Sequence, residues 1–167
     1  LFTSDTNQVA TMVNSMSAIA SAFTILFLFW TITAFGRKIY FKNNDAEKSK
    51  IFAVLGAGIV GSLTYTFSDS FWFSAVEGEV YALSSFFTAL TFWCVLKWEE
   101  VADSPNSSKW LILIAYLIGL SIGVHLLSLL TIPAIAMIYY FKNYKYSHKG
   151  ALITLVSSSL ILLFVQG

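Results

Sequence analysis

The chain has 167 residues, of which 57% are hydrophobic, 17% are aromatic and only 11% carry a charged side chain. This composition excludes an ordinary soluble domain and indicates an integral membrane protein. The formal net charge of +1, with basic residues confined to short connections, argues against a nucleic-acid partner, and the single cysteine, Cys94, excludes a disulfide and a cysteine-based metal site.

The sequence opens at Leu1 without a methionine or a signal-peptide pattern, and it stops at Gly167 directly after an apolar run. We therefore expect an internal fragment of a longer protein.

The first half of the chain predicts three membrane spans. Residues 9–35 carry no charged side chain and form the first span, with Asp5 or Thr6 as the cap of its helix. The connection 36–50 has more Lys and Arg than acid, which indicates the cytoplasmic side and places the start of the chain outside. A second span, 51–67, then leads outward, and a third, 80–98, returns.

Between the second and third spans the sequence concentrates its outer acidic residues. Asp69, Glu77 and Glu79 stand there among the aromatic residues Phe71, Trp72, Phe73 and Tyr81. Because carboxylates beside hydrocarbon are costly, they need a functional or structural reason. We predict that this connection faces outward and holds part of an active site.

The apolar run 110–141 is too long for one simple span, because 32 helical residues would measure about 48 Å against a hydrocarbon core of about 30 Å. If it crossed once, the basic segment 142–149 would lie outside, against the positive-inside tendency. We therefore predict two short helices, 110–124 and 127–141, that meet near the outer surface around His125.

A last span, 150–167, completes six predicted membrane segments in a single all-α transmembrane domain with no soluble part. Gly56–Gly61 matches G-x-G-x-x-G, but a dinucleotide site needs a strand and a βαβ context that a membrane span excludes. The physical interpretation is helix packing, through a smooth face of Ala53, Ala57 and Gly61 and a second face of Ala115, Gly119 and Gly123.

The individual candidates also have structural explanations. Glu77 fits a capping box in which Ser74 caps the third span and Glu77 binds back to the amide of Ser74. If that helix has already begun, Glu79 points about 200° away from Glu77, while Tyr81 shares the face of Glu77. Trp72 and its aromatic neighbours fit an interfacial belt as well as a substrate platform.

His125 stands alone in an apolar setting, with Ser121 before it and Ser128 after it. A hydrogen-bonded turn residue is the simpler interpretation of such a histidine, and a metal ligand the less simple one. Its expected depth matches that of the acidic connection, which favours a contact with a phosphate.

Several runs resemble a bacterial multi-pass membrane family that is related to eukaryotic transmembrane protein O-mannosyltransferases. They are residues 14–18, 66–72, 75–83 and 119–125, followed by Pro133. The resemblance implies the GT-C superfamily fold and a sugar donor on polyprenyl phosphate, used on the non-cytoplasmic face. It implies that Glu79, followed by Glu77, lies near the donor phosphate or the acceptor, with His125 near the same cavity. We expect Glu79 and Glu77 to be catalytic, and Asp69, Trp72, Tyr81 and His125 to bind substrate.

The chain departs from that superfamily at one point. A catalytic Asp is usual in the first large outer loop, and Asp5 does not match its motif, so the role is not transferred. We expect that Asp before Leu1, and we expect the fragment alone to be inactive. No metal ligand is assigned, and the residues are equally compatible with members of the superfamily that use a divalent metal and with members that do not.

The resulting hypothesis is transfer of a mannose-like sugar to a protein or glycan acceptor at the bacterial inner membrane, with membrane lipids around the chain. Two other classes stay open. One is a transporter or lipid flippase that uses Glu77, Glu79 and His125 as a substrate or proton site. The other is a non-catalytic subunit that binds partners in a membrane complex.

Overall fold

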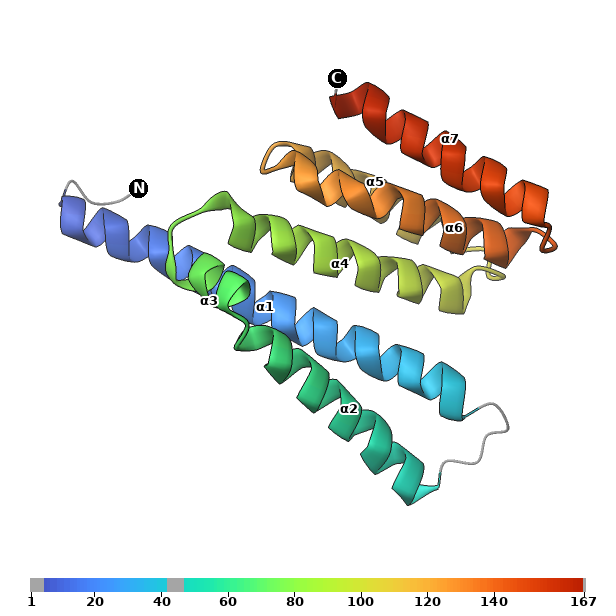
Figure 1. Ribbon diagram of the computed structural model, residues 1–167, viewed down its shortest axis with the longest axis horizontal. Helices are drawn as coiled ribbons and strands as arrows, with labels where there is room; N and C mark the ends of the chain where they lie inside the picture. The colour runs from blue at the N-terminus through green and yellow to red at the C-terminus, as the bar shows by residue number, and fades with distance from the viewer. Residues whose placement is uncertain (1–4, 42–46, 167) are drawn as a thin grey trace. The chain divides into compact units, whose positions relative to one another are not determined.

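Helices form every regular element in the part of the chain that the computed structural model describes, residues 5–41 and 47–166. Their bounds are α1 (Thr6–Tyr40), α2 (Lys48–Thr66), α3 (Asp69–Val76), α4 (Val80–Val101), α5 (Ser108–Ile122), a 3-10 turn η1 (Leu126–Leu130), α6 (Thr131–Asn143) and α7 (His148–Gln166) (Figure 1). The expected all-helical fold is confirmed. Residues 42–46 of the expected basic connection, with Lys42 and Asp45, lie outside the described residues, as does Gly167.

Within the described ranges, four helical segments are long and apolar enough to cross a membrane, where six were expected. They are Gln8–Tyr40, Lys48–Thr66, Val80–Val101 and Leu126–Asn143. Ser108–Ile122 and His148–Phe164 are apolar but shorter. Ser108–Ile122 would measure about 22 Å and His148–Phe164 about 26 Å, both less than a hydrocarbon core of about 30 Å, and these two helices account for the difference in the count. The chain is an integral membrane protein.

The chain divides into two units, Leu1–Trp93 and Cys94–Gly167. In the first unit α1 packs against α2, and Gly58 marks the close approach. A methyl group added at Gly58 would come within 2.7 Å of Thr33 Cγ2 and 2.9 Å of the Phe29 ring. Such small residues let two helices pack closely where lipid offers no hydrophobic driving force between them.

The contact face of α2 differs from the expected one. Its buried residues are Val54, Gly58 and Ser62, whereas Ala53 and Ala57 are exposed. Gly61 does approach α1, at Ile32. Each buried residue of α2 thus lies one position after the corresponding expected residue. The Phe29 ring of α1 occupies the space beside Gly58, which has no side chain.

Aromatic rings join α1 to the part of α4 that belongs to the first unit. Phe27 lies 5.4 Å from Trp93 and 6.1 Å from Phe86, measured between ring centroids, and Trp30 lies 5.5 Å from Trp93. Tilted pairs at such distances are favourable beyond the area that they bury. The cluster holds α4, between Phe86 and Trp93, beside α1.

In the second unit the long apolar run is broken. Helix α5 ends at Ile122, and Figure 1 shows the chain reversing direction before α6. Lys142 at the end of α6 forms a 2.8 Å ion pair with Asp103 in the connection before α5. The turn at His125 and this ion pair therefore lie at opposite ends of the α5–α6 hairpin.

The second expected packing face is wrong. The residues of α5 that become buried are Ile114, Leu117 and Ser121, and Ala115, Gly119 and Gly123 are exposed. Nothing lies within 4 Å of a methyl group added at Gly119. The close helix contact of this unit is instead made by Gly150 of α7 against the Tyr140 ring of α6.

Candidate functional site

Glu77, Gly78 and Glu79 form an extended turn between α3 and α4, which we call the acidic elbow. The Glu77 amide donates to the Phe73 carbonyl at 3.1 Å and ends α3. The Glu79 amide donates to the Glu77 carbonyl at 2.8 Å, and α4 begins at the next residue. Both glutamates are exposed. Two carboxylates are therefore presented from a short hydrogen-bonded turn.

The capping box expected at this point is wrong. Ser74 lies inside α3, where its hydroxyl donates to the Ser70 carbonyl at 2.9 Å, and Glu77 follows the last residue of that helix. No helix runs continuously from Glu77 to Tyr81, so the expected shared face of these two residues does not exist. Glu77 and Glu79 belong to the turn and not to the first turn of a helix.

Close contact with α1 holds the elbow in place. A methyl group added at Gly78 would come within 2.7 Å of Val13 Cγ1 and 3.0 Å of Asn14 Oδ1. A larger residue must therefore move either the elbow or α1. The spacing of the sequence gives no signal for this contact, because the partners are far apart in the chain.

Helix α3 carries the other candidates of the first unit. Phe71 is buried with its ring centroid 4.6 Å from that of Tyr65, while Trp72 is half exposed and stacks on Phe67 at 6.1 Å. Asp69 is exposed in the first turn, where the helix dipole favours a negative charge. An outward aromatic pair of this kind suits both a membrane interface and the face of a sugar ring.

The candidates of the first unit do not form one tight cluster. Asp69 and the elbow lie at opposite ends of the eight-residue α3, about 12 Å apart along its axis. Tyr81 is exposed in the first turn of α4, next to the elbow. The elbow and Tyr81 therefore form one group, and Asp69 and Trp72 form another.

His125 belongs to the second unit and caps η1. Its Nδ1 accepts a hydrogen bond from the Leu127 amide at 3.0 Å, its own amide donates to the Ser121 carbonyl, and its carbonyl accepts the Ser128 hydroxyl at 2.8 Å. Because Nδ1 is an acceptor, the neutral ring carries its proton on Nε2. The side chain is partly buried and has a clear structural role in the turn.

Among residues 5–41 and 47–166, no three His, Cys, Asp or Glu side chains gather in a way that could hold a metal ion. The buried polar side chains of the same residues are all serine or threonine. The ionisable candidates are consequently at helix ends and not within the spans.

Comparison with known proteins gives one match. Residues 1–148 fit the family described as the protein O-mannosyl-transferase TMEM260 N-terminal domain. No curated protein sequence and no solved structure matches the chain.

Proposed function

The chain belongs to the protein O-mannosyl-transferase TMEM260 N-terminal domain family, and from this premise we propose that its parent protein transfers a mannose-like sugar from polyprenyl phosphate to a protein or glycan hydroxyl. The family's name supports the sugar and the type of reaction. The donor, the acceptor, the non-cytoplasmic face and the bacterial inner membrane are our proposals.

The observation that carries the proposal is the exposure of Glu77 and Glu79 on an ordered turn at the end of two helices. A lipid-linked sugar presents its phosphate at the membrane surface, and its hydroxyl groups are hydrogen-bond donors that carboxylates accept. The exposed ring of Trp72 offers a flat surface for a sugar at the far end of α3. The elbow and α3 together suit the binding of a sugar at this depth.

In the proposed reaction the acceptor oxygen attacks the anomeric carbon while the bond from that carbon to the phosphate oxygen breaks. A carboxylate takes the proton of the acceptor hydroxyl, and the polyprenyl phosphate leaves with the bonding electrons. The anomeric centre is inverted. We assign Glu79 first, and Glu77 second, to contact with the acceptor hydroxyl or the transferred sugar.

His125 and Tyr81 are proposed substrate contacts. We propose that the His125 ring, which is fixed in the turn through Nδ1, contacts the donor phosphate. Tyr81 adjoins the elbow and offers a hydroxyl to the sugar.

The experiment is sugar transfer from a labelled polyprenyl-phosphate donor by the full-length protein in membranes. We expect Glu79→Gln to lower the rate by about 100-fold or more, which is the usual contribution of a positioned acid or base. Glu47→Gln is the matched control. Glu47 precedes the first residue of α2, whereas the elbow follows α3, and the Glu47 side chain makes no capping hydrogen bond to the helix. Equal rates for the two variants would remove Glu79 from the reaction.

A further inference from the structure

The connection between α6 and α7 carries two lysines that no acidic residue in the described part of the chain neutralises. Residues 142–149 contain three lysines and His148 and no acid. Lys142 is paired with Asp103, but Lys145 and Lys149 are exposed and make no ion pair with any residue that the structure describes. Two lysines are thus available to an anion at this end of the second unit.

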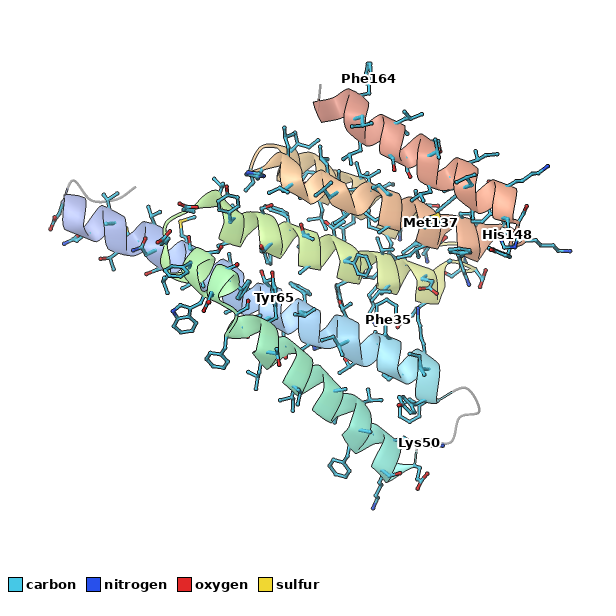
Figure 2. The ribbon with its side chains drawn as sticks, in the orientation of Figure 1. Phe35, Lys50, Tyr65, Met137, His148 and Phe164 are labelled. Atoms are coloured by element: carbon cyan, nitrogen blue, oxygen red, sulfur yellow. The ribbon has the colours of Figure 1, made fainter. Side chains whose placement is uncertain are left out.

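The connection is held by a specific set of hydrogen bonds. The Tyr140 hydroxyl accepts from the Ser147 amide at 3.1 Å and lies 3.3 Å from the carbonyl oxygens of Lys145 and Ser147, to one of which it donates. The Tyr146 hydroxyl is 2.8 Å from Nδ1 of His148. Figure 2 shows His148 at this end of α7, with nitrogen-tipped side chains projecting beside it. The lysines are therefore carried by an ordered turn.

An apolar cavity of about 330 Å³ begins beside the same turn. Its walls come from Ile118 of α5, Ile132, Ile135 and Ala136 of α6 and Thr154 of α7, and Tyr144, the neighbour of Lys145, lines it too. The cavity is open to the surface of the protein, and its lining is almost entirely apolar. In a membrane, the acyl chain of a neighbouring lipid can fill this cavity.

We propose that this region binds one anionic phospholipid, with its phosphate between Lys145 and Lys149 and one acyl chain in the cavity. The Leu126–Asn143 segment is long enough to span the membrane, so the turn after it lies at the depth of the lipid headgroups. The two exposed lysines match the charge of the headgroup, and the apolar walls match the chain. This lipid site uses residues of the second unit alone and does not depend on sugar transfer.

The test titrates delipidated full-length protein in detergent with phosphatidylglycerol, and native mass spectrometry measures the bound lipid. Phosphatidylcholine with the same acyl chains should bind more weakly, and glycerol phosphate should not compete. K145Q/K149Q should weaken phosphatidylglycerol binding by about thirtyfold, from about 1 kcal/mol for each lysine near an anionic surface. K48Q/K50Q, in the first turn of α2, is the control with the same loss of charge, and it should bind phosphatidylglycerol normally.

A second pair of variants tests the cavity. Ala136→Leu places a larger side chain in the cavity and should weaken phosphatidylglycerol binding, whereas Ala134→Leu changes an exposed residue of the same helix and should not. Unchanged binding by both K145Q/K149Q and Ala136→Leu would overturn the proposal. Equal binding of phosphatidylcholine, or full competition by glycerol phosphate, would overturn it as well.

Discussion

His125 holds the turn between α5 and η1 through its ring and its backbone. Its Nδ1 and backbone are used by Leu127, Ser121 and Ser128, which explains why the chain can break there between two apolar helices. A backbone amide freed within a membrane protein is costly unless a partner satisfies it. The proposed function adds a contact between the His125 ring and the donor phosphate.

Substituting His125 separates the two roles. Asn is a good helix cap, so His125→Asn should keep the bond to the Leu127 amide, whereas His125→Ala should lose about 1 kcal/mol of stability. We expect thermal unfolding of the full-length protein in detergent to show this difference. Transfer should fall for both variants, because neither has the imidazole ring. Normal transfer by His125→Asn would leave His125 with a structural role only.

At the elbow, the residue pattern does not decide between the start and the end of a helix. The acidic connection and its exposed glutamates follow from charge and hydropathy, but the Ser74 to Glu77 spacing fits a helix start as well as a helix end. The structure has the helix end, because α3 has already formed from Asp69 onward. The contact of Gly78 with Val13 and Asn14 depends on how α1 lies, which local sequence does not contain.

At the scale of elements, the contact between α1 and α2 depends on Gly58. Gly58→Ala should destabilise the full-length protein by about 1–3 kcal/mol, because the new methyl group meets Thr33 and the Phe29 ring. Gly56→Ala is the matched control on the same helix, since nothing lies within 4 Å of the added methyl group, and it should be neutral or gain up to about 1 kcal/mol from helix propensity. The thermal unfolding midpoint in detergent measures both, and a similar loss for the two would contradict the packing described.

The helical class of the fold follows from the apolar runs, since residues kept away from water must satisfy their backbone groups within helices. The packing faces do not follow from it. In α2 the small residues allow two adjacent rows, and the side chains of α1 select the row of Gly58. The short α3 was not expected either, because a single turn pattern inside a connection carries little signal.

At the scale of the whole molecule, the family match and the four membrane-spanning helices of the described residues both indicate a membrane protein related to protein O-mannosyl-transferases. The match covers residues 1–148, which includes the elbow and the turn at His125. The ion pair between Lys142 and Asp103 joins the end of α6 to the connection before α5, so these two segments lie at the same end of the α5–α6 hairpin.

The proposed function requires that the elbow and the turn at His125 face one side of the membrane and that both basic connections face the other. In a cysteine-free background of the full-length protein, single cysteines at four positions are labelled in intact cells with a membrane-impermeant maleimide. We predict that Glu79→Cys and His125→Cys are labelled at once, and that Lys38→Cys and Lys149→Cys are labelled only after the membrane is opened. Labelling of Glu79→Cys and His125→Cys from different sides, or of either lysine position from outside, would contradict the account.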